Sequence, residues 1–295
     1  METSLKSEDV IIIGGGPAGM ISAIQLKRYG IRARVIEAHR LGGLLWNANL
    51  VENYPGFPAG IPGPKLVRLF TRQFESLGLE LIRQRAVSLD FEGGVFVVTT
   101  DAGQYAARTL VIATGTQPNT FPAGFIPDDG LAQVFYEVAP LLEVREKQIA
   151  IIGAGDAAFD YAINLSRKNE VMILNRTQEI KALPLLVQRC AKIQNIQYLQ
   201  DVPVSSVSVE SGRLVLNVID QENSCFHVDL LIGAIGRKEN LPSMTDRLIA
   251  EQSRLVGAGR LQIVGDVQNG IYRQTAIAVG DGLKAAMRIY QFLKE

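Results

Sequence analysis

Two short glycine-rich turns are the residues of this sequence whose types and spacing most directly suggest chemistry. The first turn reads Gly14-x-Gly16-x-x-Gly19, after the apolar run 10–13 and before a helical pattern that continues to Tyr29. Glycines at this spacing allow a tight turn, close approach of a pyrophosphate to the backbone, and close packing of helix on strand. The free N–H groups and the positive dipole end at a helix N-terminus then face the phosphates. The pattern therefore predicts a dinucleotide site.

An acidic residue after the next predicted strand supports the same interpretation. Glu37 directly follows the predicted strand Ala33–Ile36, 18 residues beyond Gly19. A carboxylate at the end of this strand accepts hydrogen bonds from ribose hydroxyls. The remaining residues of this predicted first site are Pro17, Ala18 and Ala38.

The same unit recurs 139 positions later. The strand-like run Gln148–Ile152 leads into Gly153-Ala154-Gly155-Asp156-Ala157-Ala158, and a second strand-like run spans Glu170–Leu174. Asn175 and Arg176 stand where the first unit has its acid. Because a neutral residue beside an arginine leaves space and charge for a 2′-phosphate, the second site is predicted to favour NADP(H) over NAD(H).

Two similar segments frame the second unit and suggest how the domains are connected. Residues 110–115 and 230–236 are each an apolar strand that ends at a glycine, and Asn119 and Asn240 follow at equal distances. A chain that leaves one domain, builds another and returns needs two such strands, and 295 residues suffice for two domains. We therefore predict an α/β fold with two Rossmann-like, three-layer dinucleotide-binding domains, the second inserted into the first. Residues 1–116 and 239–295 would form the first domain, and residues 117–238 the second.

Composition excludes several classes of function. The 30 Lys and Arg balance the 30 Asp and Glu, so no basic field exists for nucleic acid or anionic lipid. Residues 1–10 lack a signal-peptide core and no run approaches the about 18 apolar residues of a membrane span, which predicts a cytoplasmic protein without a membrane partner. Cys190 and Cys225 are the only cysteines, so there is no C-x-x-C or disulfide framework. The two histidines, His39 and His227, are far apart in sequence, and no metal site is predicted.

With these features the chain resembles the two-dinucleotide-binding flavoprotein disulfide reductases, and within them it is similar to the low-molecular-weight thioredoxin reductases. The resemblance extends over nearly the whole chain. It is carried by both glycine turns, the inserted-domain order, Ala113-Thr114-Gly115, Gly265-Asp266, and the segments 42–57 and 272–276. It implies an oxidoreductase with FAD in the first domain, NADP(H) or NAD(H) in the second, and a homodimer.

The resemblance also assigns residues to the two cofactors. For FAD it adds Gly43, Leu44 and Asn53 near the isoalloxazine, Asp266 on the ribityl–phosphate side, and Val87, Ala113, Thr114, Gly115, Gly265, Arg273, Gln274, Thr275 and Ala276. For the pyridine nucleotide it implies Gly153, Gly155, Asp156, Ala157, Asn175, Arg176, Lys181, Ile235 and Gly236. The apolar periodicity from Arg273 to Leu293 predicts a helix whose N-terminus faces the flavin, where its dipole stabilises negative charge. No catalytic side chain is assigned, because the cofactors carry the chemistry.

The sequence departs from the family where the redox dithiol belongs. Counting back from Gly153 by the family's spacing leads to Tyr136-Glu137-Val138-Ala139, which contains no sulfur. Cys190 falls in a helical stretch and Cys225 near a strand, and both are predicted to be structural thiols with no neighbouring histidine to favour a thiolate. The relay from flavin to a disulfide is therefore expected to be missing.

Other departures concern the second site and the loop after the first acid. The family's basic cluster is His-Arg-Arg with a further Arg, and the aligned residues here are Asn175-Arg176-Thr177 with Lys181. Fewer cations are compatible with weaker NADP(H) binding, with a relaxed choice between NAD and NADP, or with loss of pyridine nucleotide use. Leu44 replaces a usual Gln, and Trp46 nearby is expected either beside the flavin or as core filling. The return segment around residues 244–247 is expected to be a solvated loop.

Three functions remain open at this level. The favoured one is an FAD-dependent NAD(P)H oxidoreductase that passes electrons through flavin N5 to a non-disulfide acceptor, and that is not a competent thioredoxin reductase. Acceptors in this class are ferredoxin, flavodoxin, a quinone, free flavin and oxygen. The segment 134–138 is similar to thioredoxin-reductase-like ferredoxin–NADP reductases, although those usually extend beyond the last helix. The alternatives are a flavoprotein reduced by ferredoxin or a partner without pyridine nucleotide, and a non-enzymatic flavin-binding sensor or scaffold.

Overall fold

The computed structural model describes residues 7–219 and 225–295. Residues 1–6, on which the argument against a signal peptide partly rests, lie outside the described residues. The chain forms two compact units: Met1–Trp46, Val51–Gln117 and Glu239–Glu295 make the first, and Asn47–Leu50 and Pro118–Lys238 make the second. The chain thus crosses between the units one residue after the first predicted boundary. The assignment of Asn47–Leu50 to the second unit was not expected from the sequence.

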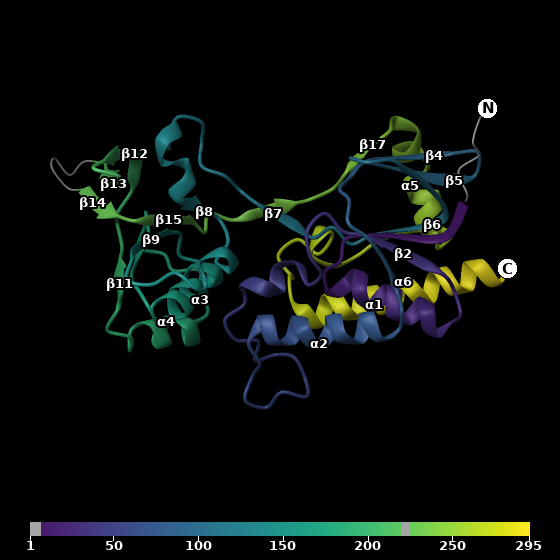
Figure 1. The fold of residues 1–295 in the computed structure, drawn as a ribbon, viewed down its shortest axis with the longest axis horizontal. Helices are drawn as coiled ribbons and strands as arrows, with labels where there is room; N and C mark the ends of the chain where they lie inside the picture. Colours follow the sequence, from purple (N-terminus) through teal and green to yellow (C-terminus); the bar gives the residue numbers. More distant parts are fainter. Residues whose placement is uncertain (1–6, 220–224) are drawn as a thin grey trace. The chain divides into compact units, whose positions relative to one another are not determined.

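The first unit consists of one large β-sheet and the α-helices that pack against it. Its strands are β1 (Ser7–Ile13), β2 (Ala33–Ile36), β3 (Glu80–Ile82), β4 (Ala86–Glu92), β5 (Val95–Thr100), β6 (Gln104–Ile112), β17 (Ser243–Met244) and β18 (Leu261–Ile263). Its helices are α1 (Pro17–Arg28), α2 (Gly63–Ser76), α5 (Asp246–Gly257) and α6 (Thr275–Lys294), with short 3₁₀ helices at Gly43–Asn47 and Gly265–Val267. The sheet order is β17-β4-β5-β6-β1-β2-β3, and β18 also pairs with β6 (Figure 1). The β3-β2-β1-β6-β18 part is parallel, whereas β4, β5 and β6 form an antiparallel meander.

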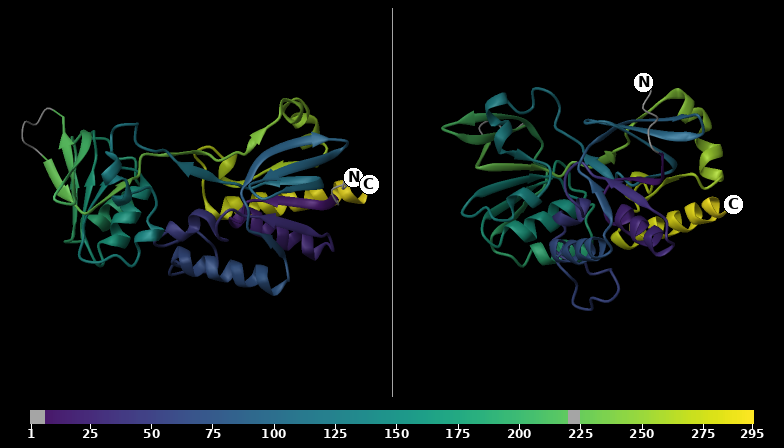
Figure 2. Two further views of the ribbon diagram at one scale, coloured as in Figure 1. Left: turned by 45° about the horizontal axis from the view of Figure 1, so that its top comes forward. Right: turned by 45° about the vertical axis from the view of Figure 1, so that its right-hand side comes forward.

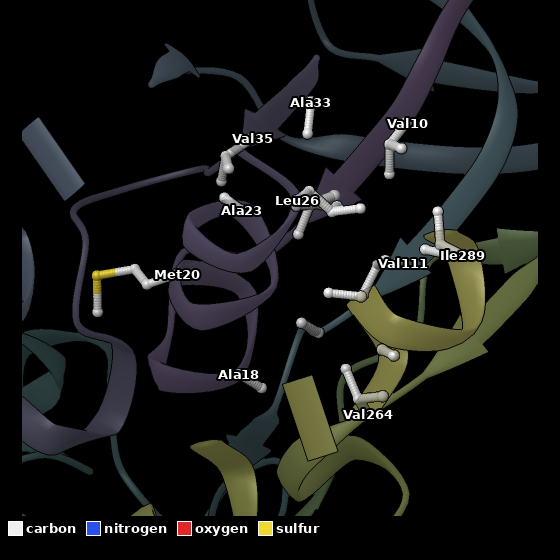
Figure 3. Close-up of a cluster of buried hydrophobic side chains, with 14 of the residues drawn as sticks. Val10, Ala18, Met20, Ala23, Leu26, Ala33, Val35, Val111, Val264 and Ile289 are labelled. Carbon is white, nitrogen blue, oxygen red and sulfur yellow. The ribbon is translucent and has the colours of Figure 1, made fainter. Parts of the chain in front are cut away.

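Alternate residues of β1 face opposite sides of this sheet, and each side has its own core. Val10 and Ile12 pack in a cluster with α1 and α6, whereas Ile11 and Ile13 pack in a cluster with β4, β5 and α5. Figure 3 shows the first cluster, with Val10 from β1 and side chains from α1 and α6 around it. A central parallel strand is buried on both faces and is therefore apolar throughout, as the run 10–13 is. The predicted three-layer α/β class is confirmed.

The C-terminal helix α6 packs along α1. The Ser22 hydroxyl on α1 lies 2.8 Å from the carbonyl oxygen of Ala18 and 2.9 Å from that of Gly282 on α6, so it bridges the two backbones. On the apolar side, Ala285, Ala286 and other residues of α6 join the cluster on that face of the sheet. Across residues 7–219 and 225–295, α6 included, no helix combines the length and apolarity that crossing a membrane requires.

The second unit has the same kind of layering on a smaller scale. Its strands are β8 (Val134–Phe135), β9 (Gln148–Ile152), β10 (Glu170–Leu174), β11 (Ile196–Leu199), β12 (Val204–Glu210), β13 (Arg213–Val218), β14 (Cys225–Val228) and β15 (Leu230–Gly233). Its helices are α3 (Asp156–Leu165) and α4 (Pro184–Cys190), with 3₁₀ helices at Asp128–Gln133 and Ala139–Leu141. The parallel sheet β11-β10-β9-β15-β8 carries α3 and α4 on one face and the antiparallel β12-β13-β14 on the other (Figure 2). Where the chain passes between units, β7 (Thr116–Pro118) pairs with β16 (Arg237–Glu239).

The return segment was predicted wrongly as a solvated loop. It forms β17 and α5, and Thr245 between them caps the helix, since its Oγ1 accepts a hydrogen bond from the Leu248 N–H at 3.3 Å. The Thr245 hydroxyl also donates to Asp90 Oδ1 at 2.6 Å, and Arg247 donates to Asp90 Oδ2 at 2.7 Å. These contacts lower the pKa of the Asp90 carboxyl, and the hydrogen bond from Thr245 has the largest effect. Because Asp90 is far away in sequence, local patterns do not reveal this structure.

We expect Thr245→Ala to lower the free energy of unfolding by about 1 kcal/mol, because α5 loses its N-cap. The Asp90 carboxyl loses a hydrogen-bond donor in the same variant. Thr245→Ser keeps the hydroxyl and is expected to stay close to the wild type. Urea denaturation followed by far-ultraviolet circular dichroism measures both, and equal stability of the Ala and Ser variants would contradict the capping role.

Candidate cofactor-binding sites

The first glycine turn lies between β1 and α1, at the carboxyl ends of the parallel strands. Gly14 has a φ of +102°, and a Cβ at this position would collide with the carbonyl oxygen of Ala113, which follows β6. The Gly14 N–H donates to the carbonyl oxygen of Ile36 at the end of β2, at 2.8 Å. Only glycine satisfies both contacts, so the turn is held between the two strands that flank β1.

The start of α1 is left open by this turn. A Cβ on Gly19 would collide with the carbonyl oxygen of Gly14, so the helix approaches the strand closely. Gly16 is the N-cap residue and offers no side-chain cap, and an added Cβ there would meet no atom within 4 Å. The first backbone N–H groups of a helix have no partner within the helix. Residues 16–19 therefore offer an open anion site of the kind that binds a pyrophosphate.

The carboxylate of Glu37 is held beside the turn by two backbone groups. The Gly15 N–H donates to Oε2 at 2.7 Å, and the His39 N–H donates to Oε1 at 2.8 Å. Each oxygen keeps further acceptor capacity, so the carboxylate can also accept from ribose hydroxyls. Val87 is connected less directly, since it is half exposed on β4 and its carbonyl accepts from Ser243 rather than from the turn.

The loop after Glu37 crosses back over the glycine turn. The Gly42 N–H donates to the carbonyl oxygen of Gly15 at 2.8 Å, and a Cβ on Gly43 would lie 3.3 Å from the Cα of Gly16. Trp46 braces this loop: its indole N–H donates to the carbonyl oxygen of Leu41 at 2.8 Å, and the Arg40 guanidinium lies 4.1 Å from its ring centre. These contacts hold the indole ring of Trp46 against its own loop.

The exit turn after β6 carries a buried hydroxyl that suggests a ligand. Thr114 Oγ1 is buried, and among the described residues it has no hydrogen-bond partner. The turn itself is fixed, because Asn240 donates from its backbone N–H to Gly115 O at 3.0 Å and from Nδ2 to Thr114 O at 3.5 Å. Leaving a buried hydroxyl unpaired costs about 1–3 kcal/mol. A polar ligand beside the glycine turn would remove that cost.

The start of α6 brings two more predicted residues together. Asn53 Nδ2 donates to Gln274 Oε1 at 2.8 Å, and Gln274 is the N-cap residue of α6, which begins at Thr275. Arg273 pairs with Glu239 at 3.4 Å. The open end of the helix, where Thr275 and Ala276 lie, is therefore next to Asn53, as needed for a helix N-terminus that acts on a flavin.

Asp281 is a residue of this region that sequence reasoning missed. Its Oδ2 accepts from the Gly265 N–H at 3.3 Å and from Asn269 Nδ2 at 2.6 Å. The carboxylate thus fixes the turn that carries Gly265 and Asp266. No sequence signal identified it, because an acid on an amphipathic helix is normally a solvated residue.

The second glycine turn repeats the geometry of the first. Gly153 has a φ of +141°, and a Cβ there would collide with the carbonyl oxygen of Ala234, which follows β15. Its N–H donates to the carbonyl oxygen of Leu174 at the end of β10, at 3.1 Å. Gly155 is the open N-cap residue of α3, with no atom within 4 Å of an added Cβ. The start of α3, with Asp156 and Ala157, thus presents a second open helix N-terminus.

The second exit turn is also fixed in the same way. Asn119 donates from its backbone N–H to Gly236 O at 3.0 Å and from Nδ2 to Ile235 O at 3.3 Å. Asn240 makes the equivalent pair of contacts with the exit turn of the first unit. The two asparagines that end the repeated segments therefore have equivalent structural roles.

The second site differs from the first at the residue after the second strand. The amide of buried Asn175 does not reach the glycine turn: Nδ2 donates to Glu179 O at 2.9 Å and to the Tyr198 hydroxyl at 3.0 Å. Its Oδ1 accepts from the Thr177 N–H at 3.3 Å. Asn175 was predicted as a nucleotide-binding residue, and in the structure its side chain forms hydrogen bonds within its own loop and with Tyr198 on β11.

This loop crosses the second glycine turn as its counterpart crosses the first. The Lys181 N–H donates to the carbonyl oxygen of Ala154 at 2.9 Å, and the Leu183 N–H donates to Asp156 Oδ1 at 2.7 Å. The exposed side chains of Arg176 and Lys181 lie on the same loop. The backbone of Lys181 therefore lies against the glycine turn, and Arg176 belongs to the same loop.

Residues 136–139, where the resemblance led us to look for a dithiol, make structural contacts. The Tyr136 hydroxyl accepts from the Phe121 N–H at 3.0 Å, Glu137 pairs with Arg237 at 3.0 Å, and Val138 is fully buried. Ala139 donates from its N–H to Asn47 Oδ1 at 2.9 Å. The four residues 136–139 therefore belong to the packing of the second unit.

Both cysteines are free thiols, and they differ in solvent exposure. Cys190 is buried at the end of α4, and burial raises the pKa of its thiol to about 11. Cys225 is exposed, and its Sγ lies 3.6 Å from His227 Nε2, which corrects the expectation that no histidine neighbours it. Within the described ranges, no group of three His, Cys, Asp or Glu side chains is placed to hold a metal ion.

The short segment 47–50 is tied to α3 through Asp160. The Asn49 N–H donates to Asp160 Oδ2 at 2.9 Å, and Arg167 donates to Asn49 Oδ1 at 2.7 Å. Burial raises the pKa of Asp160 to about 6, although the hydrogen bond from Asn49 and the charge of Arg167 oppose this. Sequence reasoning missed this partly buried acid, because its partner lies 111 positions away.

Comparison with known proteins places both sites in context. A model of the family described as pyridine nucleotide-disulphide oxidoreductase matches residues 8–282. The thioredoxin reductase of Streptomyces coelicolor is 32% identical, with 97% of this chain and 94% of that protein covered. The thioredoxin reductase of Borreliella burgdorferi is 26% identical, with 97% and 92% covered. The crystal structure of Lactococcus lactis thioredoxin reductase in the FR conformation has a TM-score of 0.82 at 25% identity, covering 98% and 99% of the chains. Bacillithiol disulfide reductase from Bacillus cereus shares the fold, with a TM-score of 0.73 at 19% identity and 97% and 99% covered.

We expect Thr114→Val to change the stability of the flavin-free protein and the affinity for FAD in opposite directions. Removing a buried unpaired hydroxyl is expected to raise the free energy of unfolding by about 1 kcal/mol, and losing its hydrogen bond is expected to weaken FAD binding severalfold. Thermal denaturation of the flavin-free protein and a flavin fluorescence titration measure the two effects. Thr114→Ser is the control, and unchanged FAD affinity in the Val variant would show that the hydroxyl faces no ligand.

A second prediction concerns pH and Asp160. Because its pKa in the folded protein lies above the ordinary value of 3.8, the ionised form opposes folding. The free energy of unfolding should therefore fall as pH rises from the ordinary value to about 6, by at most about 3 kcal/mol. Asp160→Asn keeps an acceptor for Asn49 and should remove this part of the pH dependence. Chemical denaturation of both proteins between these pH values is the test, and parallel curves would contradict the assignment.

Proposed function

Because the chain belongs to the pyridine nucleotide-disulphide oxidoreductase family, as an oxidoreductase of the thioredoxin reductase-like type, we propose that it transfers electrons from NAD(P)H through FAD to an acceptor that is not a disulfide. Thioredoxin reductase-like members of the family use FAD and NADPH. In this proposal the first unit binds FAD and the second unit binds the pyridine nucleotide. The chain would contribute binding and orientation, and the cofactors the chemistry.

The residues of the first unit fit FAD. The open N-terminus of α1 at Gly16 would hold the pyrophosphate, and the oriented carboxylate of Glu37 would accept from the adenosine ribose. The unpaired Thr114 hydroxyl supplies a polar partner beside the turn, and the N-terminus of α6 would place its positive dipole end at the isoalloxazine. When bound, FAD supplies a hydride acceptor at N5 and passes electrons onward. Asp281 would act indirectly, by holding the turn of Asp266 in place.

The second unit would position the pyridine nucleotide with the same backbone geometry. The open end of α3 at Gly155 supports a pyrophosphate site. The exit turn at Ile235–Gly236, fixed by Asn119, borders it in the way that Thr114–Gly115 borders the first site. Arg176 and Lys181 on the crossing loop would face the adenosine end of the nucleotide.

The proposed class of acceptor is supported by one observation: the chain lacks a second accessible thiol that could form a disulfide with Cys225. Dithiol relay requires two sulfurs that reach each other and one thiolate to attack. Cys190 is buried with the pKa of its thiol raised to about 11, and it is protonated at neutral pH. Cys225 is exposed but single. We therefore infer that electrons leave to ferredoxin, flavodoxin, a quinone, free flavin or oxygen, and that the protein is not a competent thioredoxin reductase.

A homodimer remains part of the proposal. It rests on the resemblance to thioredoxin reductases and is supported by three exposed apolar side chains of α6, Ile277, Leu283 and Met287. Sedimentation equilibrium of the flavin-loaded protein tests it directly.

An anaerobic titration separates the proposed function from its alternatives. NADH and NADPH are each added to the oxidised holoprotein, and the reduced protein is then offered ferredoxin, a quinone, oxygen and thioredoxin in turn. Bleaching of the flavin by a nicotinamide, with reoxidation by any acceptor except thioredoxin, is the expected result. No bleaching by either nucleotide would favour a flavoprotein reduced by a partner. Absence of turnover with stoichiometric copurification of one partner would favour a sensor or scaffold.

We expect the double variant Cys190→Ala, Cys225→Ala to keep both flavin reduction and turnover of the non-disulfide acceptor. No thiol lies on the proposed electron path, so rate constants should stay within about twofold of the wild type. Stopped-flow flavin absorbance measures both half-reactions. The single variants are the controls, and loss of acceptor turnover in Cys225→Ala alone would place a thiol on the path.

A further inference from the structure

We infer that the second unit binds NAD(H) and NADP(H) with nearly equal affinity, because opposing charges cancel around the subsite for the adenosine 2′ position. This inference rests on the proposed pyridine nucleotide role of the second unit. It concerns the loop 175–181, which we call the ribose loop, and the residue Asp201. The sequence alone favoured NADP(H), from the pair Asn175-Arg176.

The ribose loop is the structural counterpart of the loop that follows Glu37. Asn175 Oδ1 accepts from the N–H two residues later, as Glu37 Oε1 does from His39. Each loop then crosses its glycine turn, with Lys181 donating to Ala154 as Gly42 donates to Gly15. The residues of the ribose loop therefore border a position in the second unit that is equivalent to the ribose position beside Glu37 in the first unit.

Asn175 contributes little selectivity of its own at this place. Both hydrogens of its amide are donated inside the protein, to Glu179 O and to the Tyr198 hydroxyl. Its Oδ1 is shared with a backbone N–H. In contrast to Glu37, it has no carboxylate that would favour a free 2′-hydroxyl and repel a 2′-phosphate. The choice between nucleotides is left to the charged side chains of the loop.

Two cations and two anions lie on the ribose loop or contact it. Arg176 is exposed and makes no ion pair with any described residue, so it can face a phosphate. Lys181 Nζ is 3.9 Å from Glu179 Oε2, so its charge is partly neutralised. Asp201, just after β11 beside β10, accepts from Gln178 Nε2 at 2.9 Å and adds a second negative charge to the loop. A phosphate of about −2 charge is attracted by the cations and repelled by both acids.

The expected sizes follow from solvent exposure. All four charged groups lie in exposed residues, where one pair changes binding by about two- to fivefold, and salt reduces the effect. Removing either acid should therefore shift the preference toward NADP(H) by that factor. Removing Arg176 should shift it the other way by a similar factor.

Calorimetric titration of the oxidised holoprotein with NAD⁺ and NADP⁺ tests the inference without turnover. In the wild type the two dissociation constants should agree within about threefold. Glu179→Gln and Asp201→Asn should each favour NADP⁺ by about two- to fivefold and Arg176→Gln should favour NAD⁺ equally, with smaller shifts at higher salt. Asn is suited to position 201, where φ is +54°, since it tolerates that conformation.

The matched control is Glu170→Gln, which removes the same charge at the opposite end of β10 from the ribose loop. It should leave the ratio of the two constants unchanged. The inference would be overturned if the wild type bound NADP⁺ at least tenfold more tightly than NAD⁺, or if Glu179→Gln and Glu170→Gln changed the ratio of the two dissociation constants equally. Either result would leave the proposed function intact. Failure to bind either nucleotide, together with no flavin bleaching by NADH or NADPH, would overturn both.

Discussion

The fold depends on one repeated close contact, between a glycine and the carbonyl oxygen that follows a neighbouring strand. Gly14 lies against Ala113 and Gly153 lies against Ala234, in both cases with no room for a Cβ. This contact holds the strand exit, the start of the following helix and the end of the second strand at one edge of the sheet. Any larger residue would separate these three elements and remove the open helix N-terminus that they create.

Around this common backbone the two units use their side chains differently. In the first unit, two backbone N–H groups hold the Glu37 carboxylate beside the turn. In the second, the shorter Asn175 side chain is used within its own loop, and exposed charges border the same position. A carboxylate that is partly buried and held by two hydrogen bonds is screened less by solvent than the exposed charges of the second unit. The geometry therefore supports a tightly defined site in the first unit and a permissive one in the second.

The same contrast applies to electron transfer. The elements that support cofactor binding are intact, but the segment 136–139 serves packing, through the Tyr136 hydroxyl and the Glu137–Arg237 ion pair. A flavin needs only an accessible acceptor, while dithiol exchange needs two sulfurs at bonding distance. Under the proposed function, an acceptor other than a disulfide would therefore require no change in the rest of the fold.

The sequence by itself determined the α/β class, the two glycine turns and the strands Ala33–Ile36, Gln148–Ile152 and Glu170–Leu174, because their patterns depend on neighbours a few residues apart. It also determined the number and spacing of the cysteines, which limits the chemistry whatever the fold. Only the tertiary structure decided the roles of Asn175, Asp281 and Thr245, the helix α5 in the return segment, and the packing of 47–50 with the second unit. These depend on hydrogen bonds between distant segments or on which way a side chain turns, and local spacing carries no information about either.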